Sequence, residues 1–127
     1  MIEVAVVLGV GRQPLHWHVP PEASRVALPD SRSLWEVLWA ERERVSGVAH
    51  THPGHGEPWP SFEDLTTFDA CELGLGVRLE WWIATADRVR RFARMGHGPF
   101  DYAPVPTPAE EADTAPWLAE LRRRSGM

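Results

Sequence analysis

The sequence predicts an α/β domain in which a mixed sheet is flanked by helices. Two runs rich in β-branched or aromatic residues, 2–8 and 77–85, adjoin glycines and are typical of buried strands. Two segments with apolar residues at helical spacing, 31–45 and 61–73, lie between these runs. A chain of 127 residues has room for one core, so we expect a single domain over 1–127.

The first part of the chain predicts a hairpin. The strand at 2–8 ends at a glycine, a turn follows at 11–14, and 15–19 alternates apolar and polar residues as a half-solvated strand does. His16 and His18 share one face of this second strand. Because no carboxylate arrangement lies nearby in the sequence, we interpret them as solvated or hydrogen-bonded histidines and not as a metal pair.

A helix and a further strand come next. We expect a short strand at 25–28, followed by a helix that Asp30 or Ser31 caps and that runs to about Val45. Its apolar residues fall near helical spacing, while most of its charged residues take the other side. A serine and a glycine end this helix, and a strand at 48–52 follows.

The second helix is expected from Ser61 to about Leu73, with glycines just beyond it. Asp69 and Glu72 lie off its apolar face. The apolar face repeats every three residues and contains Leu65, Phe68 and Cys71. Since the chain has one cysteine, no intramolecular disulfide can form, and we interpret this cysteine as a core residue and not as a nucleophile.

The rest of the chain predicts two strands, a segment of undecided structure and a final helical segment. Strands are expected at 77–85 and 100–105. Helical spacing and an edge strand compete over 87–95, whose arginines we interpret as a solvated face, with the binding of an acidic partner as the less favoured alternative. A helical segment interrupted by Pro116 closes the chain, and its last residues, 122–127, are expected to fray. The residues expected to dock it on the domain are Trp117, Leu118 and Leu121.

Composition restricts the expected partners and compartment. The formal net charge of −5 argues against a nucleic-acid partner bound through bulk electrostatics. The apolar run at the start is too short to cross a membrane and lacks the basic start of a signal peptide. We therefore expect a cytoplasmic protein with neither a nucleic-acid nor a membrane partner, and the sequence leaves the oligomeric state open.

Potential metal ligands gather between residues 50 and 64. His50 and His52 are separated by one residue, so on a strand both side chains point to the same face and can reach one ion. Asp64 follows a loop rich in glycine and proline as a third, oxygen ligand. Three protein ligands with an open water position are typical of catalytic zinc, so these residues predict a zinc site. Ser61 and Asp64 also match a capping box, which competes for the same carboxylate, but the two histidines favour the ligand role.

This pattern resembles the JAMM motif of the JAB/MPN metalloprotease family, which is His-x-His-Pro, a short spacer and Ser-x-x-Asp. The resemblance implies a JAB/MPN-like domain with a curved mixed sheet, in which His50, His52 and Asp64 bind zinc. It also implies that Ser61 stabilises the reacting oxyanion and that a glutamate far upstream activates the attacking water.

Glu3 is our candidate for that glutamate. It stands ahead of the apolar run that ends in Gly9, as the glutamate of the family stands at its first strand. The same position also fits the polar end of an edge strand. Glu22, Glu36 and Glu41 remain candidates for the general base.

The resemblance implies zinc-dependent cleavage of a peptide or isopeptide bond at the tail of a ubiquitin-like or sulfur-carrier protein, with a cell-wall peptide as a more distant option. One alternative is a catalytically silent MPN-type binding module, although such modules ordinarily lose the ligands that this chain keeps. Another is a cupin-like metal-binding barrel, whose ligand spacing His50, His52 and Glu57 would match. That pattern requires glycines where this chain has Arg44 and Asp64.

Overall fold

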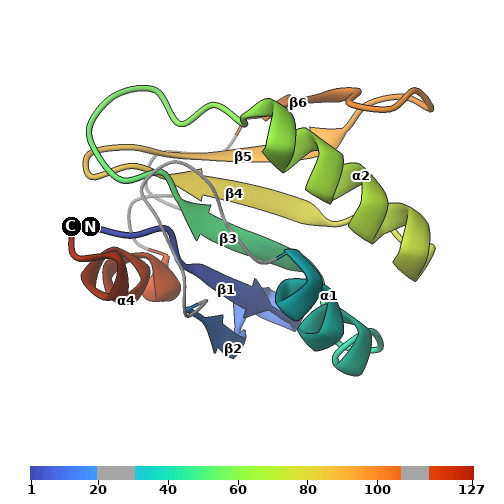
Figure 1. The fold of residues 1–127 in the computed structure, drawn as a ribbon, viewed down its shortest axis with the longest axis horizontal. Coiled ribbons are helices and arrows are strands. Elements are labelled where there is room, and N and C mark those ends of the chain that lie inside the picture. Colours follow the sequence, from blue (N-terminus) through green and yellow to red (C-terminus); the bar gives the residue numbers. More distant parts are fainter. Residues whose placement is uncertain (20–30, 107–114) are drawn as a thin grey trace.

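A six-stranded mixed sheet forms the centre of the molecule (Figure 1). The computed structural model describes residues 1–19, 31–106 and 115–127. Within this part of the chain the sheet is open, its order is β2-β1-β3-β4-β5-β6, and only β3 and β4 run parallel. The strands are β1 (Ala5–Leu8), β2 (Pro14–His18), β3 (Gly47–Thr51), β4 (Glu80–Ala84), β5 (Val89–Arg94) and β6 (Tyr102–Val105). The predicted α/β class with a mixed sheet in one small domain is confirmed.

Helices cover both faces of this sheet. The helices are α1 (Ser31–Ala40), α2 (Phe62–Leu75) and α4 (Pro116–Ser125), with a short 3-10 helix, η1 (Val10–Arg12), between β1 and β2. The first two pack on one face, and α4 packs on the other, where the two ends of the chain lie side by side (Figure 1). None of the described helices combines the length and the apolar character needed to cross a membrane.

Each face of the sheet buries its own hydrophobic core, because alternate strand residues point to opposite faces. Under α1 and α2, Phe68 stacks on Trp81 with 4.2 Å between the ring centroids. Cys71 belongs to this core, as predicted, and burial raises the pKa of its thiol to about 12. Under α4, Trp82 meets Trp117 edge-on with 5.3 Å between the centroids. The central strands are therefore buried on both sides, as parallel strands usually are.

The strands lie where the sequence predicted them. β1 and β2 form the predicted hairpin, in which Ala5 pairs with His18. β3, β4 and β6 coincide with the predicted strands at 48–52, 77–85 and 100–105, apart from shifts at their ends. The segment 87–95, for which the sequence allowed a helix or an edge strand, forms β5 between β4 and β6. It is therefore a strand, but not an edge strand.

The first helix is shorter than predicted. α1 ends at Ala40, and the expected end near Val45 is wrong. The physical reason is that the N–H of Ser46 already donates to the carbonyl of Leu8 at 2.8 Å, so the chain has joined the β1–β3 ladder there. Val45 still packs against the core, from a loop instead of a helix. The predicted strand at 25–28 lies outside the described residues.

The last helix also differs from the prediction. Pro116 begins α4 instead of interrupting it, because the first helical position needs no N–H donor. Residues 122–127 do not fray, since the helix continues to Ser125 and Gly126 caps it with a left-handed φ of 86°. The predicted docking of this segment is confirmed by three fully buried side chains, those of Trp117, Leu118 and Leu121. The stretch 107–114 lies outside the described residues.

Glu72 was expected off the apolar face of α2, yet it is buried. Its carboxylate accepts hydrogen bonds from the N–H of Leu79 at 2.8 Å and from Trp81 Nε1 at 3.0 Å. The Tyr102 hydroxyl and Arg94 Nε also donate to it, at 2.6 and 3.0 Å. These donors offset the free-energy cost of burying a charge, so a polar residue occupies a core position.

Arg91 and Arg94 of β5 are ion-paired and mostly buried, so their interpretation as a merely solvated face is wrong. Arg91 forms an ion pair with Glu80, which also binds Arg12 at 3.3 Å. Arg94 binds Asp69 in addition to its bond with the buried glutamate of α2. These pairs fix β5 against β4 and against α2.

Gly47 begins β3, where it pairs with Glu80 of β4. A Cβ at this position would lie 2.6 Å from the carbonyl oxygen of Glu80, a backbone atom that cannot rotate away. We therefore expect Gly47→Ala to lower the free energy of unfolding by about 1–3 kcal/mol, measured by urea denaturation. Gly98→Ala is the control, because its Cβ would meet no atom within 4 Å. Equal stability of the two variants would contradict the close approach.

Candidate metal centre

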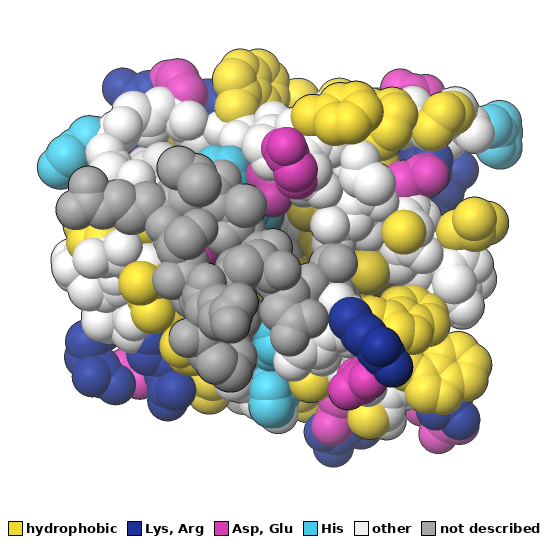
Figure 2. Space-filling view, viewed as in Figure 1, with side chains coloured by type: hydrophobic (Ala, Val, Ile, Leu, Met, Phe, Trp, Pro, Cys, Tyr) yellow, Lys and Arg dark blue, Asp and Glu magenta, His cyan; other side chains and the backbone are white. Residues whose placement is uncertain are grey.

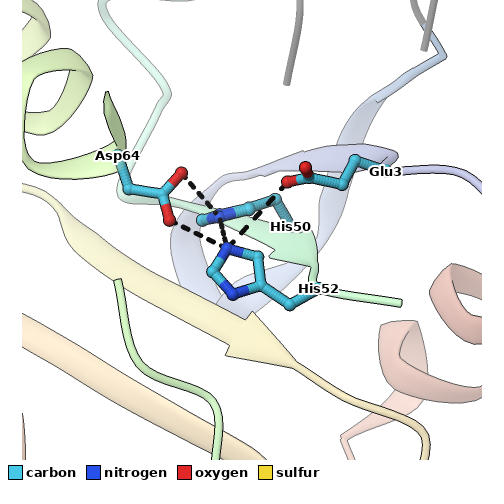
Figure 3. Close-up of side chains that lie close together, drawn as sticks. All are labelled: Glu3, His50, His52 and Asp64. Atoms are coloured by element: carbon cyan, nitrogen blue, oxygen red, sulfur yellow. Dashed lines mark hydrogen bonds and ion pairs between the residues drawn. The ribbon is translucent and has the colours of Figure 1, made fainter. Parts of the chain in front are cut away.

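Four ionisable side chains converge at one end of the sheet (Figure 3). They are Glu3, His50, His52 and Asp64, and one potential ligand atom of each lies within 4.8 Å of those of the others. Three of them are the ligands that the sequence predicted, and the fourth is the predicted general base. No other group of this kind occurs in the described part of the chain. This cluster could hold a metal ion.

The two histidines come from β3 and its continuation. His50 pairs with Ala5 of β1, and its ring packs edge-on against Phe68 with 6.1 Å between the centroids. His52 lies just past the end of β3, where its N–H donates to the carbonyl of Ala84 at 2.9 Å and keeps the chain extended. As predicted for an extended segment, the two side chains point the same way, and their Nε2 atoms are 3.2 Å apart.

Asp64 stands in the first turn of α2, and it both caps the helix and faces the histidines. Ser61 is the N-cap, whose hydroxyl accepts from the N–H of Asp64 at 3.0 Å while its own N–H donates to Asp64 Oδ2 at 2.9 Å. Asp64 Oδ2 lies 2.8 Å from His52 Nε2, and Oδ1 lies 3.2 Å from His50 Nε2. The carboxylate that caps the helix thus also faces the histidines, because the capping box orients it toward them.

The charge of Asp64 is stabilised by these neighbours. Burial by itself would raise the pKa of this carboxyl group, but the two histidines outweigh it through charge and hydrogen bonds, His50 most strongly. The pKa of Asp64 therefore lies well below its usual range. A carboxylate that stays ionised is available to bind a cation over the whole physiological range.

The separations of the potential ligand atoms are close to those around a small tetrahedral ion. Zinc bound at its usual distances to nitrogen and oxygen would hold its ligand atoms roughly 3.3 Å apart. The Nε2 atoms of His50 and His52 are 3.2 Å apart, and Asp64 places one oxygen 3.2 Å from the first and its other oxygen 2.8 Å from the second. Two imidazole nitrogens and one carboxylate oxygen can coordinate several divalent metals, so the donor set is compatible with more than one ion.

Glu3 is set back from these three ligands. Its side chain is 1% exposed, and its Oε1 lies 3.9 Å from His52 Nε2. Neither carboxylate oxygen has a hydrogen-bond partner in the described structure. Burial raises the pKa of Glu3 to about 7, with His52 lowering and Asp64 raising it by smaller amounts. A carboxyl group with this pKa exchanges a proton near neutral pH.

Glu3 is not part of an edge strand, and two of the other candidate glutamates lie away from the cluster. Glu3 does not lie at a sheet edge, because β1 runs between β2 and β3. Glu36 pairs with Arg32 on the surface of α1, and Glu41 pairs with Arg44, so neither belongs to the cluster. Glu22 lies outside the described residues.

The loop between His52 and Asp64 is fastened to the turn that joins β4 and β5. The N–H of Ala86 donates to the carbonyl of Gly54 at 2.8 Å. The hydroxyl of Thr85 donates to the carbonyl of Gly56 at 3.1 Å. The turn also supplies Asp87, which accepts from the N–H of Gly56 at 3.3 Å. Sequence reasoning did not find these anchors, although the residue types of 85–88 are typical of a turn.

Glu57 takes no part in the cluster. It forms ion pairs with Arg88 and Arg90 of the neighbouring turn and strand. The ligand set His50, His52 and Glu57 of a cupin-like barrel is therefore not assembled, and the open sheet also differs from a barrel. His55, in the same loop, has a side chain that is 81% exposed and lies 3.8 Å from Asp87, and it does not belong to the cluster.

Neither a scan against models of protein families nor a search of curated proteins finds a match for this chain. The resemblance to the JAB/MPN family therefore rests on the motif. Independently of that resemblance, the structure brings the predicted ligands to one place. The assignment of an ion and of a reaction to this place is a proposal.

Metal binding is the first property to test. We expect the purified chain to bind about one zinc ion, because three ligands already stand at suitable distances. His52→Ala and Asp64→Ala should each lose the ion, as measured by elemental analysis after zinc loading and dialysis. His55→Ala is the matched control, since it removes an exposed histidine from the adjacent loop. Retention of zinc by His52→Ala would show that the cluster is not the metal site.

Ser61 offers a second test, because its backbone and its side chain act differently. Ser61→Ala removes the acceptor for the N–H of Asp64, so we expect a loss of about 1 kcal/mol in unfolding free energy. The N–H of residue 61 still orients the Asp64 carboxylate, and zinc binding should therefore persist at the same stoichiometry. Urea denaturation and elemental analysis measure the two effects. Loss of zinc would mean that the hydroxyl, and not the backbone, holds the ligand.

Proposed function

We propose that this chain is a zinc-dependent metallopeptidase or isopeptidase. The observation that supports this proposal most is the convergence of His50, His52 and Asp64 beside Glu3, a buried carboxyl group without a hydrogen-bond partner in the described structure. A site that served only to stabilise the fold would gain nothing from this unpaired acid, which costs free energy to bury.

Zinc is the metal that we propose for this cluster. Hydrolytic zinc sites commonly use two imidazoles and one carboxylate and leave a position open to water. A bound zinc ion would lower the pKa of that water from about 15.7 to about 7, which supplies a nucleophile at neutral pH. The side chain of His52 is 26% exposed, so the cluster can be reached from solvent on this side.

Glu3 is the proposed general base. Its carboxylate is 3.9 Å from the nearest imidazole nitrogen, which is too far for a hydrogen bond but close enough for one water molecule to contact both groups. In this place it would take a proton from the attacking water and return it to the leaving amine. A raised pKa suits this role, because the group must both accept and release a proton.

Ser61 is the proposed donor to the reacting carbonyl oxygen. Its hydroxyl oxygen accepts from the N–H of Asp64, so the hydroxyl hydrogen is still available to donate. Negative charge gathers on the carbonyl oxygen in the transition state, and a donor in a fixed position stabilises it. The capping box holds Ser61 one helical turn from the ligand Asp64, which fixes that position.

A protein substrate is consistent with the surface beside the centre. Apolar side chains gather around α2 (Figure 2). Phe62, the first residue of this helix, is 69% exposed and packs on Phe100 with 5.1 Å between the ring centroids. Exposed apolar groups next to a site are typical of surfaces that contact other proteins. From the family resemblance we propose the tail of a ubiquitin-like or sulfur-carrier protein, which could bind in an extended form.

The rival proposal is a catalytically silent binding module of the MPN type. It predicts the same surface but no need for a metal or for an acid at position 3. A chain that stays free of metal after zinc loading would favour this module and would rule out the hydrolase.

Glu3→Gln separates binding from catalysis. It keeps the size of the side chain and removes its basicity, so we expect one zinc ion per chain and a loss of at least about 100-fold in hydrolysis. The assay follows the release of a short peptide fused beyond the tail of ubiquitin-like and sulfur-carrier proteins, by mass spectrometry. Glu36→Gln is the matched control, because Glu36 lies on the surface of α1. Full activity of Glu3→Gln would move the general base to another residue.

A further inference from the structure

The position of Glu3 must be set by its backbone. The residue precedes β1 by two positions, so it lies outside the strand itself. Its carboxylate has no hydrogen bond in the described structure that could hold it. Even so, it is fully buried and points at the histidines (Figure 3).

One hydroxyl group binds both peptide groups that flank Glu3. Thr51 Oγ1 accepts from the N–H of Val4 at 3.0 Å and donates to the carbonyl of Ile2 at 3.4 Å. The N–H of Thr51 also donates to the carbonyl of Val4 at 3.0 Å. Thr51 is the residue between the two histidine ligands, and it is completely buried. The backbone of Glu3 is thus tied directly to the segment that carries the ligands.

The last helix supplies a second attachment. The hydroxyl of Ser125, at the end of α4, donates to the same carbonyl of Ile2. The N–H of Ile2 in turn donates to the carbonyl of Ser125 at 2.9 Å. Ser125 is buried, and α4 is held in place where Arg122 donates to the carbonyl of Thr85 at 2.9 Å. The end of α4 is therefore a fixed support for the start of the chain.

From these contacts we infer that Thr51 and Ser125 are positioning residues, which together form a clamp that holds Glu3 at a fixed distance from the metal ligands. This inference rests on the proposed role of Glu3 as general base. The two hydroxyl groups touch neither substrate nor metal, and they act on the reaction only through the backbone on either side of Glu3. A displacement of this backbone by a fraction of an ångström would change how the carboxylate meets a water molecule beside the ligands.

The same strands contain a matched control for this clamp. At their opposite end, Ser46 Oγ donates to the carbonyl of Gly9 at 2.7 Å, which is also a hydroxyl bond from the β3 side to the β1 side. It lies at the far end of β3 from the histidines. Loss of the Ser46 hydroxyl or of a clamp hydroxyl should each lower the midpoint of thermal unfolding by a few degrees. Only the loss of a clamp hydroxyl should also change the metal centre.

The test uses cobalt(II) in place of zinc. The visible absorption bands of this ion respond to its ligands and to the groups around them, and no substrate is needed. Wild type, Glu3→Gln, Thr51→Val, Thr51→Ser, Ser125→Ala and Ser46→Ala are each loaded with cobalt(II). The cobalt content and the visible spectrum of each variant are then recorded. A double variant with both Glu3→Gln and Thr51→Val completes a double-mutant cycle, which shows whether the two substitutions act independently.

We expect all variants to keep one cobalt ion per chain. Thr51→Val and Ser125→Ala should shift the spectrum in the same direction as Glu3→Gln, whereas Thr51→Ser, which keeps the hydroxyl, and Ser46→Ala should match the wild type. In the Glu3→Gln background, Thr51→Val should add no further shift, because it acts only through Glu3.

Wild-type spectra for both Thr51→Val and Ser125→Ala would overturn the clamp while leaving the general base in place. A further shift in the double variant would also overturn it, since Thr51 would then act on the ligands themselves. If Glu3→Gln itself leaves the spectrum unchanged, Glu3 does not act on the metal centre through a fixed position and the clamp is overturned, whereas the general base is decided separately by hydrolysis with Glu3→Gln. If the wild type binds no cobalt, the proposed metal site is overturned.

Discussion

The close approach of four ionisable side chains, three of them buried and all with ligand atoms within 4.8 Å of one another, is the constraint on which the rest of the structure depends. Buried charges lose their hydration and must be offset by partners. Asp64 is offset by hydrogen-bond contacts with two histidines and by the capping N–H of its helix, whereas Glu3 has only a longer contact of 3.9 Å with His52 and no hydrogen bond in the described structure. The free-energy cost of burying this weakly compensated acid must be carried by the two hydrophobic cores, one on each face of the sheet.

The convergence of His50, His52 and Asp64 could be predicted from the sequence because local geometry determines where these side chains point. Alternation along an extended chain puts His50 and His52 on one face, whatever the rest of the fold is. The cap of α2 fixes Asp64 in the first turn. Sequence could not show whether a capping carboxylate would also face the histidines. One carboxylate has several acceptor positions, and only the orientation of the helix shows that Asp64 contacts both the capping N–H and the histidines.

The features that sequence reasoning missed depend on partners far along the chain. Val45 falls at helical spacing, but the ladder between β1 and β3 takes over at the next residue. Glu72 has the sequence position of a surface residue, and its donors come from two strands and a connecting segment that only the fold brings together. The basic end of α4 would fray in isolation, yet Arg122 is bound to a carbonyl 37 positions earlier. In each case a specific tertiary contact outweighs the local preference.

The contact between Ile2 and Ser125 has a consequence for the order in which the protein is made. His50, His52 and Asp64 are all present once residue 64 has been added, and the strand and helix that carry them are close together in the sequence. The support of Glu3 includes the bond between Ile2 and Ser125, which lie 123 positions apart, and contacts of such long range form late in folding. A nascent chain can therefore bring the two histidines and Asp64 together before the backbone of Glu3 is held in place.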